Sequence, residues 1–249
     1  MIYVGTAAWS NPPAERLRRK DGASHLEHYG AQFDAVEINS SFYRSHRRIT
    51  YQGWREATPP QFRFSVKMPR TVTHDCALRN CRAEIEQFLA EVAGLGRKLR
   101  VILVQTPASL VFEGAVASRF FEALSSPKTY QIACEPRHPS WWTPRADAVL
   151  RRHGVARVAA DPARTPEAAS PGGAKRLVYY RLHGSPRMYY SAYSAEYLRT
   201  LATTVTTSSS ETREVWCIFD NTARHASWDN AQLLRRSIGQ APPKSTRKR

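Results

Sequence analysis

The sequence predicts a single α/β domain folded as a (β/α)8 barrel of the TIM type. Three observations lead to this prediction. Eight strand-like runs recur along the 249 residues, the chain between them is long enough for helices, and the strand ends alternate between apolar and polar side chains. Strands that alternate with helices favour parallel strands joined by right-handed crossovers.

The eight runs follow one another at intervals that leave room for one helix each. We expect strands at 2–6, 35–39, 63–67, 101–105, 131–135, 156–161, 178–183 and 215–221. Helix-like stretches lie at 24–32, 49–57, 82–93, 115–124, 145–152, 195–204 and 227–237. Together these segments give a regular series of strand and helix units.

The sixth unit departs from this series. Residues 162–175 are rich in Pro, Gly and Ala and have the composition of a loop, so we expect this unit to lack its helix. No linker divides the chain. We therefore predict one domain over 1–240, followed by a short, basic, disordered tail at 241–249.

The alternation of side chains distinguishes a barrel from an open sheet. In an open doubly wound sheet, helices cover both faces, and central strands are apolar throughout. Here one face is apolar and is expected to point outward, under the helices: Val36, Ile38, Phe64, Val66, Ile102, Val104, Ile132, Cys134, Val158, Ala160, Tyr180, Leu182, Trp216 and Ile218.

The other face becomes polar where the strands end. It carries Glu37, Asn39, Lys67, Gln105, Glu135, Asp161, Arg181, His183 and Asn221. In a (β/α)8 barrel the inward side chains at the C-terminal ends of the strands form the mouth, where such enzymes have their active sites. The sequence therefore predicts a charged site at the mouth.

Burying this many unpaired charges would cost several kcal/mol each, on the order given for isolated ions, so they must pair, meet water or meet a ligand. A network that only stabilises the barrel is one interpretation. We favour a site, with Glu37, Glu135, Asp161, Lys67 and His183 as catalytic candidates. The substrate-binding candidates are Arg70, His74, Gln105, Arg137, His138, Trp141, Arg181, Tyr193 and Asn221.

Three chemistries fit these residues. Glu135 and Asp161 could divide general acid and general base roles on a sugar-like or carbonyl substrate, with Glu37 as a further carboxylate. Lys67 or Arg181 would stabilise developing negative charge. A second chemistry is the binding of a phosphate-bearing ligand by arginine side chains and Lys67.

A divalent metal is the remaining alternative, with Glu37, Glu135, Asp161 and His183 as ligands. Against it, the sequence has no His-x-His or His-Glu-x-x-His motif, and nearby Lys and Arg would repel a cation. We therefore assign no metal ligands. No glycine-rich fingerprint or phosphate loop is present, so we expect no dinucleotide or nucleoside triphosphate cofactor.

The charge balance bears on partners. There are 37 Lys and Arg against 21 Asp and Glu, a formal charge of +16. This charge is consistent with an ordinary basic surface, and it would also attract nucleic acid. No run approaches the ~20 consecutive apolar residues of a membrane span. We predict a soluble cytoplasmic protein with no membrane partner, and the sequence leaves the oligomeric state open.

Several motifs along the chain resemble those of the YecE-like family, known as domain of unknown function 72. They are VEINSSFY at 36–43, FSVKMPR at 64–70, EPRHPSW at 135–141, YRLHG at 180–184 and FDN at 219–221. The resemblance implies a (β/α)8 barrel and brings no established reaction. Asp220 departs from it, because an Asn usually precedes Asn221 in such proteins.

We therefore predict a hydrolase or lyase that uses carboxylates at the mouth on a small anionic or polyhydroxylated, sugar-like substrate. One alternative is an endonuclease-like enzyme that binds nucleic acid and uses a divalent metal. Another is a protein that binds a phosphate or sugar ligand without turning it over.

Overall fold

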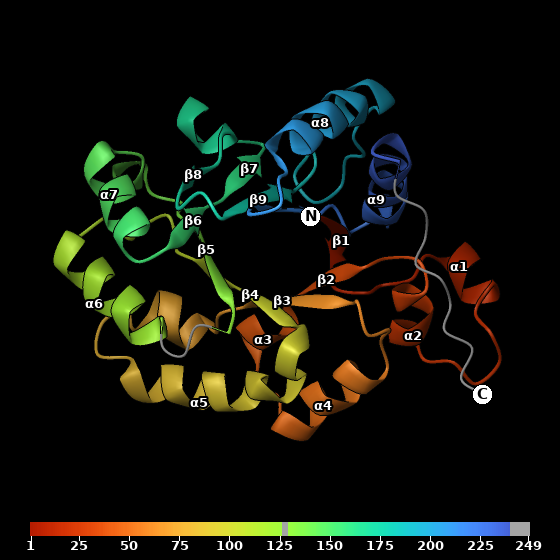
Figure 1. Cartoon of the computed structure of the whole chain (residues 1–249), viewed down its shortest axis with the longest axis horizontal. Helices are drawn as coiled ribbons and strands as arrows, with labels where there is room; N and C mark the ends of the chain where they lie inside the picture. Colours follow the sequence, from red (N-terminus) through yellow and green to blue (C-terminus); the bar gives the residue numbers. More distant parts are fainter. Residues whose placement is uncertain (126–128, 240–249) are drawn as a thin grey trace.

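The computed structural model describes residues 1–125 and 129–239. One sheet forms the centre, and helices surround it (Figure 1). Its strands are β1 (Ile2–Ala7), β2 (Ala35–Ile38), β3 (Arg63–Lys67), β4 (Leu99–Gln105), β5 (Gln131–Glu135), β6 (Val155–Arg157), β7 (Ala159–Asp161), β8 (Gly172–Gly173), β9 (Leu177–Leu182) and β10 (Glu214–Phe219). The predicted tail at 241–249 lies outside the described residues.

The order of strands in the sheet is β7-β9-β10-β1-β2-β3-β4-β5-β6-β8. Every pairing is parallel except that of β6 with β8. The sixth predicted strand is split at Val158, so that β6 pairs with β5 while β7 pairs with β9. Because β6 and β7 are consecutive in the chain, the sheet closes almost completely into the predicted barrel.

The helices form the outer layer of this barrel. They are α1 (Pro13–Leu17), α2 (His25–Gly30), α3 (Ser40–Tyr43), α4 (Arg48–Glu56), α5 (Arg82–Val92), α6 (Gly114–Leu124), α7 (Pro144–Arg152), α8 (Ala195–Ser208) and α9 (Ala226–Ser237). The short α1 and α3 were not predicted. Local signals set several starts: Ser24 and Glu27 form a capping box before α2, and Ser194 caps α8.

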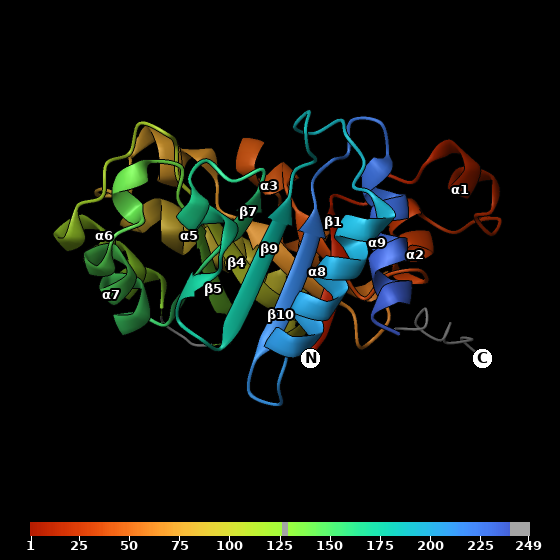
Figure 2. The ribbon, with the colours of Figure 1, turned by 90° about the horizontal axis from the view of Figure 1, so that it is seen from above.

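The sixth unit has no α-helix between β7 and β9, as expected from its composition. A short 3₁₀ turn, Pro166–Ala169, and the two-residue β8 stand in its place. The helical ring therefore passes from α7 to α8 across this segment (Figure 1). Figure 2 shows β9 and β10 side by side, with α8 in front of β10.

Two apolar clusters lie on the two sides of the sheet. The outer one includes Val36, Phe64 and Val104 and packs under the helices, whereas the inner one fills the barrel. Our outward assignment of Val158, Trp216 and Ile218 was wrong, because all three belong to the inner cluster: Tyr3, Ala7, Ala35, Val101, Leu103, Ala133, Ala156, Val158, Leu177, Tyr179, Trp216 and Ile218. The outer face of β10 is formed instead by Cys217 and Phe219.

No helix in 1–125 or 129–239 is long and apolar enough to cross a bilayer.

Candidate active site

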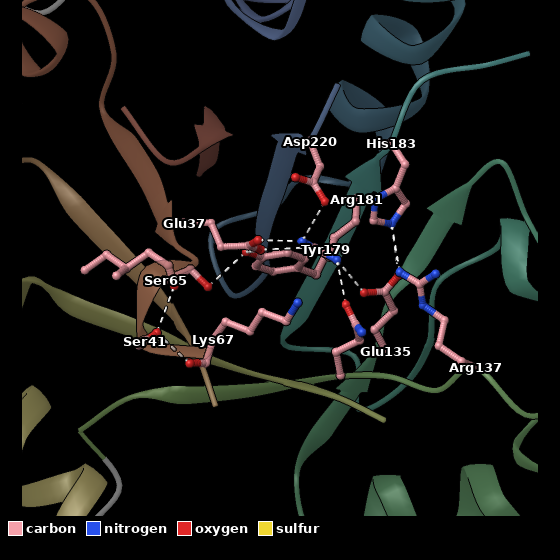
Figure 3. A network of polar contacts seen from close by, with 12 residues as sticks. Glu37, Ser41, Ser65, Lys67, Glu135, Arg137, Tyr179, Arg181, His183 and Asp220 are labelled. Atoms are coloured by element: carbon pink, nitrogen blue, oxygen red, sulfur yellow. Dashed lines mark hydrogen bonds and ion pairs between the residues drawn. The ribbon is translucent and has the colours of Figure 1, made fainter. Parts of the chain in front are cut away.

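The C-terminal ends of the strands bring together most of the predicted charged residues. Glu37 lies on β2, Lys67 ends β3, Gln105 ends β4 and Glu135 ends β5. The remaining members come from β9 and the residues that directly follow β9 and β10: Arg181, His183 and Asp220. Figure 3 shows these side chains converging from different strands. Parallel strands make this convergence possible, because their ends meet at one rim.

Arg181 is the centre of this network. Its guanidinium is 1% exposed and contacts three carboxylates. Nε and Nη2 donate to the two oxygens of Glu37 at 3.2 and 2.7 Å, Nη1 donates to Glu135 Oε2 at 2.7 Å, and Nη2 donates to Asp220 Oδ2 at 3.1 Å. Nη1 also donates to Gln105 Oε1 at 3.3 Å. The planar fork of arginine suits such multiple contacts.

His183 joins two of these carboxylates from the other side. Its Nδ1 lies 3.0 Å from Asp220 Oδ2, and its Nε2 lies 3.0 Å from Glu135 Oε1. Arg137 Nη2 lies 2.7 Å from the same Glu135 oxygen. Two acceptors on opposite ring nitrogens favour the doubly protonated imidazolium.

Electrostatics fix the protonation of the network. Burial opposes ionisation of Glu135 and Asp220 and is the largest single influence on each. The charge of Arg181, together with the charge and hydrogen bonds of His183 and other nearby cations, outweighs burial and holds the pKa of both carboxyls below their usual range. Burial also opposes the charged form of His183. The negative charge of Glu135 and the hydrogen bonds with Asp220 and Glu135 nevertheless raise the pKa of His183. Glu135 and Asp220 are therefore ionised, and His183 is biased toward imidazolium.

Lys67 differs from every other charge at the mouth. Its side chain extends toward Arg181 and Tyr179 (Figure 3). Its backbone carbonyl accepts a hydrogen bond from Ser41 Oγ, but its Nζ donates none to any acceptor in the described part of the chain. Nζ lies 4.1 Å from the ring centroid of Phe42 instead. Burial, helped by the charge of Arg181, lowers the pKa of Lys67 to about 8.

Beneath the network, an aromatic stack fills the barrel. The Tyr179 hydroxyl donates a hydrogen bond to Glu37 Oε2 at 2.8 Å, and its oxygen lies 2.9 Å from Ser65 Oγ. Its ring stacks on Trp216, which packs in turn on Tyr3. This layer excludes water from below and supports the carboxylate of Glu37.

Several predicted site residues have side chains that lie apart from the network, among them Asp161, Tyr193 and Asn221. Asp161 accepts a hydrogen bond from the Tyr193 hydroxyl at 2.8 Å and lines a cavity of about 350 Å³ beside α8. Tyr193 is itself 7% exposed and also receives the backbone N–H of Gly184. Asn221 donates to Ser191 O, so it holds the loop after β9 rather than facing the mouth.

The predicted site residues in the loops differ in whether they are buried in the core or exposed at the surface. Trp141 is 1% exposed and its indole N–H donates to Leu110 O, so it packs in the core and is not available to stack on a ligand. His138 binds Ser140 and caps the turn that carries Trp141. Arg70 is exposed and pairs with Asp75. His74 packs edge-on against Phe42, beside Lys67.

The site residues predicted from the sequence leave out four contributors to the mouth: Asp220, Tyr179, Phe42 and Tyr189. Asp220 follows a strand that is apolar on both faces, so its direction could not be read. Tyr179 lies within an apolar run. Tyr189 packs edge-on over the His183 ring and is 42% exposed, and its place in an aromatic pair beyond a strand end was its only signal.

A second cavity, of about 390 Å³, lies between α5 and α6 and is lined by residues such as Arg79, Arg82 and Phe120. It shares no residue with the mouth. Over 1–125 and 129–239, no group of three His, Cys, Asp or Glu side chains is arranged to hold a metal ion. The three mouth carboxylates instead each contact the Arg181 guanidinium, which occupies the position of a cation.

Fold and site define a parallel α/β barrel with an ionised, arginine-centred C-terminal mouth. The family model described as "Protein of unknown function DUF72" matches residues 3–249, and the chain belongs to this family. This confirms the family indicated by the sequence motifs.

Relatives agree with this placement. The chain is similar to UPF0759 protein YecE of Escherichia coli K12, 32% identical over 177 residues, which are 69% of this chain and 62% of that protein. The match thus spans less than two thirds of that relative. UPF0759 protein YunF of Bacillus subtilis 168 is 31% identical over 78 residues, 29% of this chain and 26% of that protein.

Solved structures support the fold. A DUF72 family protein from Enterococcus faecalis V583 superposes with a TM-score of 0.83 at 20% identity, covering 100% of this chain and 99% of its own. A DUF72 family protein from Thermotoga maritima MSB8 gives a TM-score of 0.79 at 25% identity, covering 96% of this chain and 100% of its own.

Proposed function

We propose that the mouth is the active site of a lyase or hydrolase that acts on a small, anionic, polyhydroxylated molecule. The observation that carries this proposal is Lys67, which is 8% exposed and has no carboxylate partner among the described residues, beside a network whose other charges are paired. Structural ion pairs rarely leave one ammonium unpaired, because desolvation then goes uncompensated.

The charges around the mouth support an anionic substrate. Arg181, Arg137 and protonated His183 balance the carboxylates of Glu37, Glu135 and Asp220. Lys67 then adds a fourth positive charge to these three carboxylates, and it forms no ion pair of its own within the described residues. The buried Nε of Arg137 also has no acceptor in the described ranges. A phosphate or carboxylate group of a substrate would satisfy both.

Proton transfer would fall to Lys67 and His183. The lowered pKa of Lys67 provides an amine that can act as a base near neutral pH. The raised pKa of His183 provides an imidazolium that can act as an acid. The carboxylates, Glu135 included, would orient Arg181 and His183, a role different from the acid and base roles expected from the sequence.

The proposal is tested by calorimetric binding of inorganic phosphate and of a panel of phosphorylated and carboxylated sugars. We expect Lys67→Met and Arg137→Gln each to weaken binding by roughly tenfold, the effect of about 1.4 kcal/mol. Lys98→Met, which removes a lysine outside the mouth, is the matched control and should bind as wild type. Equal binding by wild type and the Lys67→Met, Arg137→Gln double variant would overturn the proposal.

The formal charge of +16 supports a second candidate, an enzyme that holds nucleic acid over the mouth. It predicts affinity for duplex DNA that falls steeply with salt and cleavage that depends on Lys67. DNA affinity that survives charge removal at the mouth, without cleavage, would instead assign it to the general basic surface.

A further inference from the structure

Two of the four lysines in the described residues have a pKa lowered to about 8, and they differ in what their amino groups contact. Lys98 Nζ donates to the carbonyl oxygens of Arg55 and Thr58, both at 2.6 Å, and to Thr58 Oγ1 at 3.0 Å. All three ammonium hydrogens of Lys98 are used. Lys67 Nζ makes no such bond within the described residues. It can therefore lose a proton and become a neutral amine without breaking a hydrogen bond.

We propose that Lys67 is a covalent nucleophile that forms an imine with the carbonyl carbon of an anionic aldehyde or ketone sugar. This inference rests on the proposed function and names its substrate class. It is carried by the free amino group at the end of β3, the Phe42 ring beneath it, and the cations Arg181 and Arg137 around it.

The chemistry balances without an oxidant or reductant. The neutral amine attacks the carbonyl carbon, a C–N bond forms, and the carbonyl π electrons move to oxygen. The oxygen takes up protons from the amine and from solvent and leaves as water, so that amine, carbonyl compound and one proton give an iminium and water. The iminium then accepts the electron pair of a neighbouring C–H or C–C bond and becomes an enamine, while the proton passes to water or the cleaved fragment leaves as a carbonyl compound. Protonation of the enamine carbon restores the iminium, and its hydrolysis by water returns the free amine and releases the product, which completes the cycle a lyase requires.

The surroundings favour this reaction over simple salt-bridge formation. Burial and the Arg181 charge both disfavour the ammonium form of Lys67. At pH 7.5, a group with a pKa of about 8 holds roughly a hundred times more free amine than an exposed lysine with a pKa of about 10.4. The face of Phe42, 4.1 Å from Nζ, restricts the directions from which a carbonyl can approach.

The test is reductive trapping on the full-length protein. Dihydroxyacetone phosphate and sodium cyanoborohydride are added at pH 7.5, and intact mass and peptide mapping locate the secondary amine formed. We expect one adduct, on Lys67, at a rate at least about tenfold above that of Lys20, Lys98 or Lys175. Lys67→Arg should abolish it, whereas Lys98→Arg should leave it unchanged.

Other outcomes separate this inference from the proposed function. Equal labelling of Lys67 and Lys98 would overturn it, because a lowered pKa alone would then explain reactivity. Phosphate binding at the mouth with no adduct on Lys67 would overturn the imine and leave the proposed function standing. Absence of phosphate binding, checked on wild type and Lys67→Arg of equal melting temperature, would overturn the proposed function itself.

Discussion

The two ends of the barrel both place an arginine inside the ring of strands, but they use it differently. At the N-terminal end, Arg100 contacts both oxygens of Glu214, and Gln131 donates to the same carboxylate. The Arg100 side chain is 38% exposed and that of Glu214 is 15% exposed. At the C-terminal mouth, Arg181 and Glu37 are 1% and 0% exposed.

The difference supports the proposal that the C-terminal end binds a ligand. The N-terminal pair is one cation with one anion, partly hydrated and satisfied by its own contacts. The mouth gathers three carboxylates around one guanidinium and, within the part of the chain that the structure describes, leaves Lys67 without an ion-pair partner. Buried ion networks add little net stability compared with apolar packing. The extra charge at the mouth is therefore better explained by chemistry than by folding.

The largest expected effect comes from removing the central arginine at each end. Arg181→Met leaves Glu37, Glu135 and Asp220 without their shared cation, and we expect it to lower the free energy of unfolding by about 3–5 kcal/mol. Arg100→Met, at the partly exposed end, should cost about 1 kcal/mol or less. Urea denaturation of both variants measures the difference. Equal losses of unfolding free energy in the two variants would contradict the difference inferred between the two ends of the barrel.

The next effect has the opposite sign. Lys67→Met should raise the free energy of unfolding at pH 7 by about 1–3 kcal/mol, because the buried ammonium is disfavoured in the folded state. The folded pKa is about 8 and the unfolded value 10.5, so the unfolded chain binds more protons between them. Wild-type stability should therefore rise with pH from about 8 to 10.5, and the variant should lose one lysine's share of that rise.

Lys98→Met is the matched control for this prediction. It removes a lysine of similar pKa together with three hydrogen bonds, so its stability at pH 7 should fall or stay constant rather than rise. A gain from Lys98→Met as large as that from Lys67→Met would show that the missing partner of Lys67 has no particular consequence. The two lysines thus sharpen the contrast between a structural and a functional amine.

How far the sequence predicted this mouth depended on the contrast within each strand. Along β3, apolar residues alternate with polar ones, and in β5 and β9 one charged residue follows an apolar run. Lys67, Glu135 and Arg181 therefore lie at the mouth, as expected. In β10, residues 215–219 are apolar on both faces, and the alternation gives no direction. The prediction chose Asn221 for the mouth, whereas Asp220 occupies it.

Tertiary packing decided the remaining differences. The sixth strand breaks at Val158, so the direction expected for Asp161 from one continuous strand does not hold. Trp141 lies in a loop, where an aromatic side chain can equally face a ligand or the core, and here Phe112 packs against it. The Tyr179 hydroxyl meets Glu37 across the barrel, a contact between residues 142 apart that no local pattern reveals.

A smaller effect concerns His183 and the pH dependence of stability above pH 6.5. Its folded pKa is raised above the unfolded value of 6.5, so the stabilisation it adds is fully present below pH 6.5 and is lost as pH rises through the folded pKa. His183→Gln should remove this loss, and Asp220→Asn should reduce it by removing one partner. Urea titrations between pH 5.5 and about 9 measure it. An unchanged pH profile in His183→Gln would contradict an ion-paired imidazolium.

The smallest effect is expected from Asp161→Asn, which tests where the mouth ends. The amide oxygen of Asn can still accept the Tyr193 hydroxyl, so the free energy of unfolding should change by less than about 1 kcal/mol. Phosphate affinity should stay within about twofold of wild type, because Asp161 lies beside α8, apart from Arg181 and Lys67. Loss of phosphate binding in this variant, with the fold intact, would place Asp161 back among the residues that serve the mouth. Retained binding would confine the site to the ends of β2–β5, β9 and β10, where the charges are linked through Arg181.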